Sequence, residues 1–134
     1  MITTELLEAY KTTCYEIINP NIQIYIDIEN EVLFNFLKEN YISSWCFITA
    51  WNPYSKELSN DENIHLNNRL EKELKDYKIY VAQGQGTTGD WPPEPSFFVV
   101  DISEGDAMAL GKKYKQNAIV YGNNDGKAKL VTLV

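Results

Sequence analysis

The segment 43–51, with the sequence SSWCFITAW, constrains the fold of this chain more than any other. It is almost continuously apolar and far too short to span a bilayer as a helix, so it predicts a central strand that is buried on both faces. The chain has 134 residues, of which 44% are hydrophobic. That length fits one domain, residues 1–134, with one core and no need of disulfides or metal.

Apolar periodicity and turn residues predict the remaining elements. Helices are expected over 3–12, 30–40, 59–77 and 104–116, and strands over 14–18, 22–28, 78–83, 96–102, 117–122 and 127–134. From 43 to 121 the order is strand, helix, strand, strand, helix, strand, which is the order of a ferredoxin-like βαββαβ core. We therefore expect an α+β sandwich with a mixed or antiparallel sheet, preceded by a helix and hairpin and followed by a C-terminal strand.

The helix over 30–40 should place four apolar side chains toward the core, namely Val32, Leu33, Phe36 and Leu37. The two cysteines, Cys14 and Cys46, lie in apolar surroundings and are expected to be buried reduced thiols.

The formal net charge of −7 argues against nucleic-acid binding, which needs a basic surface, and against binding to an anionic membrane. No basic and apolar signal segment opens the chain, so we expect a cytoplasmic protein. A small-molecule ligand and a homodimer are the partners that remain open.

The sequence GQGTTG at 84–89 matches the G-x-G-x-x-G pattern of dinucleotide-binding loops. In those loops the glycines lead directly into a helix, whose N-terminus faces the pyrophosphate. Here Pro92, Pro93 and Pro95 follow, and a strand-like run comes next. We interpret 84–95 as a connection between adjacent strands, and loops of this length are often functional.

The single histidine and the single arginine, His65 and Arg69, stand one helical turn apart. The pair could bind an anion, although two solvated side chains are the simpler interpretation. A catalytic triad or a zinc site lacks partners at suitable spacing, so we expect neither cofactor nor metal. The weaker alternative is a magnesium site built from Asp61, Glu62, Asp90 and Glu94.

Polar residues follow the central strand where it ends at Asn52 and Pro53, a turn-forming pair. Strand ends followed by helix starts commonly border binding crevices. Candidate residues in this part of the chain are Asn52, Tyr54, Ser55, Glu62 and Asn63. Glu62 also has capping-box spacing from Ser59, which is a structural role.

Two further segments carry candidates. Trp91 stands between glycines and prolines, and we expect it to form a flat apolar wall over the crevice. Glu94 enters an apolar strand and needs a partner there, so the sequence predicts an ion pair with Arg69. Gln116 and Asn117 close a helix and begin a strand, and their amides could face the same crevice.

These segments together resemble a bacterial family of small proteins catalogued as a domain of unknown function. The resemblance rests on ITAWNP, on Ser-x-x-Glu-Asn at 59–63, on the Asp-Trp and Glu-Pro-Ser-Phe run at 90–97, and on Gln-Asn-Ala-Ile at 116–119. It implies a compact domain without an established activity. The motif positions map onto Thr49, Asn52, Pro53, Ser55, Glu62, Asn63, Asn67, Trp91, Glu94, Pro95, Ser96, Gln116 and Asn117.

Three functions remain open on this sequence. The preferred hypothesis is a small-ligand binding or regulatory module, with a crevice between the 52–63 loop, the 60–77 helix and the 84–96 loop. Its ligand-binding residues would be Asn52, Ser55, Asn63, Asn67, Trp91, Ser96 and Gln116. The first alternative is an enzyme acting on a nucleotide or phosphorylated small molecule, with Glu62, Glu94 and Arg69 as catalytic candidates. The second is an interaction module that pairs through an exposed sheet edge such as 127–134.

Overall fold

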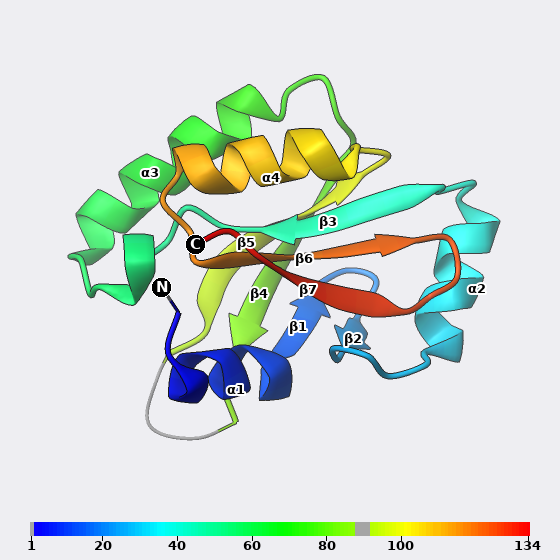
Figure 1. Cartoon of the computed structure of the whole chain (residues 1–134). Coiled ribbons are helices and arrows are strands. Elements are labelled where there is room, and N and C mark those ends of the chain that lie inside the picture. Colours follow the sequence, from blue (N-terminus) through cyan, green and yellow to red (C-terminus); the bar gives the residue numbers. More distant parts are fainter. Residues whose placement is uncertain (1, 88–91) are drawn as a thin grey trace.

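The computed structural model describes residues 2–87 and 92–134, and Figure 1 shows the whole arrangement. Its helices are α1 (Thr4–Thr12), α2 (Glu31–Glu39), α3 (Asn60–Glu73) and α4 (Glu104–Lys113), with a short 3₁₀ turn η1 (Pro53–Ser55). Its strands are β1 (Cys14–Ile17), β2 (Ile22–Ile24), β3 (Ser44–Ile48), β4 (Ile79–Gln85), β5 (Glu94–Val100), β6 (Ala118–Asn123) and β7 (Ala128–Thr132). No helix among the described residues has the length and apolarity that crossing a membrane requires.

Each of the α-helices α1 to α4 begins at a polar N-cap whose side-chain oxygen accepts a backbone N–H of the first turn. The caps are Thr3, Asn30, Ser59 and Ser103. In α3 the capping box is complete, because the side chain of Glu62 also reaches back to Ser59. Local sequence therefore fixes where each helix starts.

The seven strands form one sheet in the order β2-β1-β4-β5-β3-β6-β7, and every neighbouring pair is antiparallel. An isolated parallel bridge joins Ile26, just beyond β2, to Ala128 at the start of β7. The sheet therefore curls until its two edges meet at that point. One face becomes convex and the other concave.

Helices α3 and α4 lie side by side over the convex face (Figure 1). Odd and even positions of β3 point to opposite faces, as the pleat requires. Cys46 and Ile48 pack in one cluster with Leu70 of α3 and with Leu74, the C-cap residue of this helix, on the convex side. Trp45 and Phe47 belong to the concave side, so β3 is buried on both faces as predicted.

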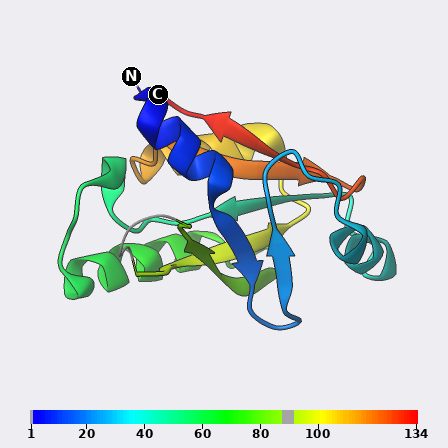
Figure 2. The ribbon, with the colours of Figure 1, turned by 90° about the horizontal axis from the view of Figure 1, so that it is seen from below.

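The concave face holds the second core cluster. Leu33, Phe36 and Leu37 of α2 close one end of it, where Phe36 packs edge-to-face on Phe98 and Tyr80. The other end is crossed by α1, which lies on the side of the sheet opposite α3 and α4 (Figures 1 and 2). Helix α1 has no fully buried residue, so this end is covered more lightly than the end under α2.

The α+β class and an antiparallel sheet are confirmed, while several details differ from expectation. Val32 is 62% exposed and the prediction that it faces the core is wrong, because Leu33, Phe36 and Leu37 already form the inner face of α2. The strand expected over 22–28 stops at Ile24, and Asp27 adopts a left-handed backbone conformation with φ 61°. Strand β5 starts two residues early, at Glu94, because Gly84 pairs with Glu94 and extends the hairpin.

Gly122 lies directly under the indole of Trp45, its neighbour in the ladder. A Cβ at this position would stand 2.5 Å from the indole ring, which is itself fully buried and stacked on Phe98. Gly122→Ala should therefore lower the free energy of unfolding by about 1–3 kcal/mol, the usual cost of overpacking a core.

Gly105→Ala in α4 is the matched control, because a Cβ there meets nothing within 4 Å. Alanine in place of a helical glycine should leave stability unchanged or raise it by up to about 1 kcal/mol. Urea denaturation of the two variants measures the difference. Equal stability of both would contradict the packing described for Trp45.

Candidate functional site

A pocket of about 330 Å³ opens on the concave face, at the end of the sheet away from α2. Its floor is apolar and comes from the sheet, with Phe47 of β3, Val120 of β6 and Leu130 of β7. Leu6 and Ala9 of α1 form a side wall. The volume is at the lower end of the range for small-molecule sites.

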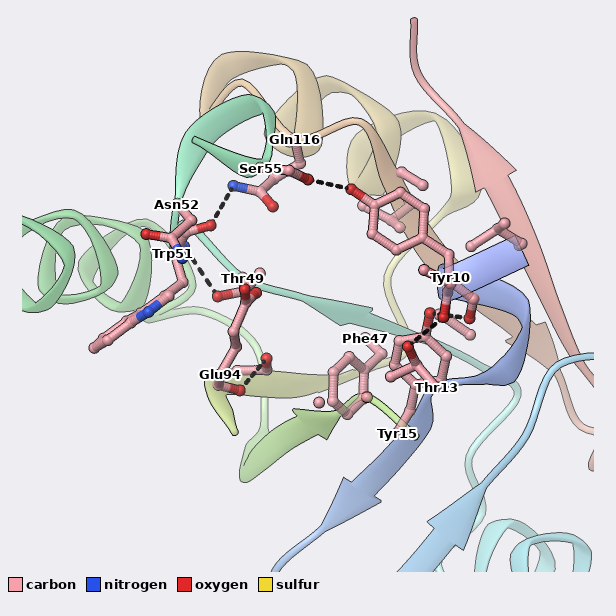
Figure 3. A pocket seen from close by; sticks show the side chains of 18 of the residues that line it. Tyr10, Thr13, Tyr15, Phe47, Thr49, Trp51, Asn52, Ser55, Glu94 and Gln116 are labelled. Atoms are coloured by element: carbon pink, nitrogen blue, oxygen red, sulfur yellow. Dashed lines mark hydrogen bonds between the residues drawn. The ribbon is translucent and has the colours of Figure 1, made fainter. Parts of the chain in front are cut away.

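Polar groups gather at the mouth of the pocket (Figure 3). They arrive from separate parts of the chain, because the ends of β3, β5 and β6 meet here. The polar lining residues are Tyr10, Thr13, Tyr15, Thr49, Asn52, Ser55, Thr87, Glu94, Ser96 and Gln116.

The turn after β3 has an uncommon backbone. Asn52, Tyr54 and Ser55 all have positive φ, at 46°, 53° and 59°. Asparagine tolerates the left-handed region, whereas tyrosine and serine adopt it only where surrounding contacts enforce it. One such contact is the bond from the Tyr54 N–H to the carbonyl of Lys115, at 2.7 Å. The turn thereby carries Ser55 to the pocket mouth.

Ser55 joins α1 to the end of β6 through a small polar cluster. Its Oγ lies 2.8 Å from the Tyr10 hydroxyl, and the Asn117 amide donates to both oxygens at 3.2 Å. The Tyr15 hydroxyl donates to the carbonyl of Tyr10 at 2.6 Å. Because α1 buries no residue fully, these bonds hold it over the pocket.

Glu94 stands on the wall of the pocket beside Thr49 (Figure 3). It is partly buried, and burial raises the pKa of its carboxyl, while a hydrogen bond from Asn52 acts in the opposite direction. The ion pairs among the described residues are Glu73–Lys113 and Glu104–Lys129, and neither includes Glu94. Within residues 2–87 and 92–134, a carboxyl group that joins no ion pair thus faces the cavity.

Two asparagines of α3 support the site from the convex side. The Asn63 amide group bonds to both the backbone N–H and the side-chain oxygen of Asn52, each at 2.8 Å. Asn67 accepts from the Ala50 N–H at 2.8 Å and donates to the Pro95 carbonyl at 2.9 Å. Both are buried, at 1% and 7% exposure, so their polar atoms are directed to the protein.

The structure brings together five of the predicted site residues, because Asn52, Ser55, Glu94, Ser96 and Gln116 all line the pocket. Asn63 and Asn67 stand behind it. Glu62 completes the capping box of α3 and does not line the cavity. Trp91, like Asp90, lies outside the described residues.

The predicted Glu94–Arg69 ion pair is wrong. Arg69 is exposed on α3, where its charge acts on Glu73 and Tyr114. Glu94 faces the concave side of the sheet, whereas α3 covers the convex side. The crevice is accordingly bordered by α1 in place of the 60–77 helix.

Sequence reasoning missed the contribution of the N-terminal segment. Leu6, Tyr10, Thr13 and Tyr15 line the pocket, whereas the sequence predicts only an added helix and a hairpin strand over 3–18. One signal was present: a helix with few strongly apolar positions carries a tyrosine, Tyr10, whose hydroxyl needs a polar partner. The sequence gives no indication of where α1 lies.

Chemically, the arrangement offers an apolar cavity with hydrogen-bonding groups and one carboxyl at its mouth. No group of three or more His, Cys, Asp or Glu side chains suited to a metal ion occurs within residues 2–87 and 92–134. Such a site suits binding of a small molecule, and its carboxyl could also exchange a proton with a bound ligand.

A compact α+β protein with a pocket at one end of a curled antiparallel sheet is the class that the fold and site define. The family model described as "Protein of unknown function (DUF3293)" matches residues 48–119, and the chain belongs to this family. The matched segment runs from the last residue of β3 to the start of β6 and includes Asn52, Ser55, Glu94, Ser96 and Gln116. No curated protein and no solved structure matched the chain.

Asn67 and Asn68 allow a matched test of the supporting role. Asn67→Ala removes the partners of a buried backbone N–H and of the Pro95 carbonyl, so the free energy of unfolding should fall by about 1–3 kcal/mol. The exposed Asn68→Ala should change it by less than about 0.5 kcal/mol. Urea denaturation measures both, and similar losses in the two variants would refute the role given to Asn67.

Glu94→Gln should raise the Tm of the ligand-free protein at neutral pH. Burial raises the folded-state pKa of Glu94 above its ordinary value of 4.5, so the charged carboxylate disfavours folding at pH above that folded pKa. The penalty decreases as pH falls through the folded pKa and is absent below the ordinary value. The Tm advantage of Glu94→Gln should decrease over the same interval.

Thermal unfolding followed by circular dichroism between about pH 4 and pH 8 measures this effect, on either side of the ordinary carboxyl pKa. The exposed Glu57→Gln is the control for loss of one negative charge. A Glu94→Gln variant less stable than wild type at neutral pH would show that the carboxylate has a favourable structural partner.

Proposed function

We propose that this protein binds a small molecule in the pocket on the concave face of its sheet. The observation that carries the proposal is the convergence of Asn52, Ser55, Glu94, Ser96 and Gln116 on one cavity that also has an apolar floor. Apolar pockets with a few convergent polar groups are the usual form of a small-molecule site.

The backbone of the 52–55 turn supports the same proposal. Left-handed tyrosine and serine are costly, at about 1–3 kcal/mol each, and such residues cluster at functional sites. Here they place Ser55 against Tyr10 at the pocket mouth. A turn with a purely connecting role has no need of this geometry.

A second candidate is an enzyme in which Glu94 moves a proton to or from the bound molecule. The raised pKa of its carboxyl favours this role, since acid–base groups work best when their pKa lies near the working pH. The described lining residues include no Lys, Arg or His, which weighs against a phosphorylated substrate. Turnover of a bound compound that Glu94→Gln abolishes would favour this candidate.

An interaction module that pairs through β7 has less support. Strand β7 is the last strand in the sheet order. However, Ala128 at its start already forms a bridge with Ile26, and its carbonyl accepts the Asp27 N–H. As a finer proposal on the fold, the order β4-β5-β3-β6, with α3 and α4 on one face, supports a ferredoxin-like core over 43–121.

Two tryptophan variants of α1 test the proposed site. Ala9 lines the pocket and is exposed, so Ala9→Trp should fill the mouth without disturbing the core. Glu8 is its exposed neighbour and does not line the pocket, so Glu8→Trp is the matched control. A fragment library screened by protein-observed NMR should yield ligands that shift pocket resonances.

Ala9→Trp should weaken the binding of those ligands at least about 10-fold, a loss of about 1.4 kcal/mol, and Glu8→Trp should leave it unchanged. If no fragment binds, or if the bound fragments are insensitive to Ala9→Trp, the proposed function is refuted.

A further inference from the structure

We infer that the pocket selects a small amine, whose ammonium group pairs with Glu94 while its apolar body lies against Phe47, Val120 and Leu130. The inference rests on the proposed binding function and narrows it to a ligand class. Its basis is the charge and the hydrogen-bonding state of the groups around the cavity.

The charge of the lining points to a cation. Glu94 is the one charged side chain among the described lining residues, and no ion pair in residues 2–87 or 92–134 includes it. The segment 88–91, with the sequence TGDW, contains no Lys, Arg or His. A partly buried carboxylate of this kind is stabilised most by a cation that comes with the ligand.

The hydrogen-bonding state of the lining points the same way. The Thr49 hydroxyl already donates to the Pro95 carbonyl at 2.7 Å, and the Ser96 hydroxyl donates to the Glu94 carbonyl at 3.0 Å. The Gln116 amide nitrogen donates to the carbonyls of Trp51 and Tyr114. The side-chain donors of Thr49, Ser96 and Gln116 are therefore already engaged with protein carbonyls.

Acceptors remain. Within the described residues, the hydrogen bonds of Gln116 are made by its amide nitrogen, so its side-chain oxygen is left to accept. The Glu94 carboxylate accepts a hydrogen bond from Asn52, and a carboxylate has further lone pairs that can accept from a ligand. An ammonium group has three donors and no acceptor, so it complements this set better than a hydroxyl or a carboxylate does.

The remaining lining suits an apolar body of limited size. Phe47 and Tyr15 meet edge-to-face with ring centroids 5.1 Å apart, and Val120, Leu130 and Leu6 complete the floor and one wall. A cavity of about 330 Å³ has room for one ring or a short alkyl chain. Aromatic rings also favour a neighbouring cation.

Benzylamine, benzyl alcohol and benzoate form a probe set that keeps the ring and changes the charge of its substituent. At pH 7.5, benzylamine should bind the wild-type protein at least about 10-fold more tightly than either analogue, because only the ammonium group both donates to the carboxylate and compensates its charge. Kd values come from protein-observed NMR titrations with probe up to about 10 mM.

Glu94→Gln should weaken benzylamine binding at least about 10-fold and leave benzyl alcohol within about 3-fold. The exposed Glu57→Gln is the control for net charge. In wild type the preference for the amine should decrease as the pH is lowered through the pKa of Glu94. Tyr10 and Tyr15 are the other titratable groups among the described lining residues. Burial raises the pKa of Tyr15, so its phenol stays neutral over that range.

Equal affinity for the amine and the alcohol, a preference for benzoate, or benzylamine binding that survives Glu94→Gln would each overturn the inference. So would undetectable benzylamine binding. The proposed function has a separate outcome, because fragments of another class whose binding Ala9→Trp removes would leave the pocket established and the amine excluded.

Discussion

The site depends on the way that the ladder between β3 and β5 ends. The two strands pair as far as Ile48 and Phe97. Alternate residues of β5 direct their backbone groups toward β3. After Phe97 the next of these is Pro95, which has no N–H to donate. At this point Asn67 of α3 takes over, with its amide bonded to the Ala50 N–H and the Pro95 carbonyl.

The Asn67 amide thus replaces backbone hydrogen bonds between β3 and β5, which has two consequences. The strand ends stay fixed to α3, so the positions of Thr49 and Glu94 are determined by the core. The concave face also loses its regular cover beyond Phe47, which leaves room for the pocket. Asn63 lies one helical turn before Asn67 in α3 and holds Asn52 in a similar way, through hydrogen bonds to its backbone N–H and its side-chain oxygen. The two asparagines thus tie the irregular turn after β3 to helix α3.

The sequence predicted the elements because each has a local cause. Continuous apolarity marks β3, capping residues mark the helix starts, and the glycines and prolines separate β4 from β5. It also predicted that Asn52, Ser55, Glu94 and Gln116 would meet, since strand ends and helix ends gather at one edge of a sheet. What these arguments share is that they need only the order of elements and not their relative orientation.

The sequence did not predict features that depend on how the elements are oriented relative to one another. The pairing of Glu94 with Arg69 assumed that both face the same side of the sheet, whereas pleat alternation sends Glu94 to the concave face. The position of α1 follows from hydrogen bonds of Tyr10 with Ser55 and Asn117, which are separated from it by 45 and 107 positions in the chain. No local pattern encodes contacts at such separation, and the shallow apolar face of α1 does not specify where it packs.

The contrast between the asparagines and Glu94 separates structural from functional polarity at this end of the molecule. Asn63 and Asn67 are buried with protein partners, which is what a structural role requires. Glu94 is partly buried and joins none of the ion pairs within residues 2–87 and 92–134. Burial raises the pKa of its carboxyl, so its charge is expected to oppose folding at neutral pH. A glutamine of nearly equal size would avoid that penalty. A carboxylate that destabilises the free protein is explained if its partner is a cationic ligand. The ion pair that offsets the cost of burying the charge then forms only when the ligand binds.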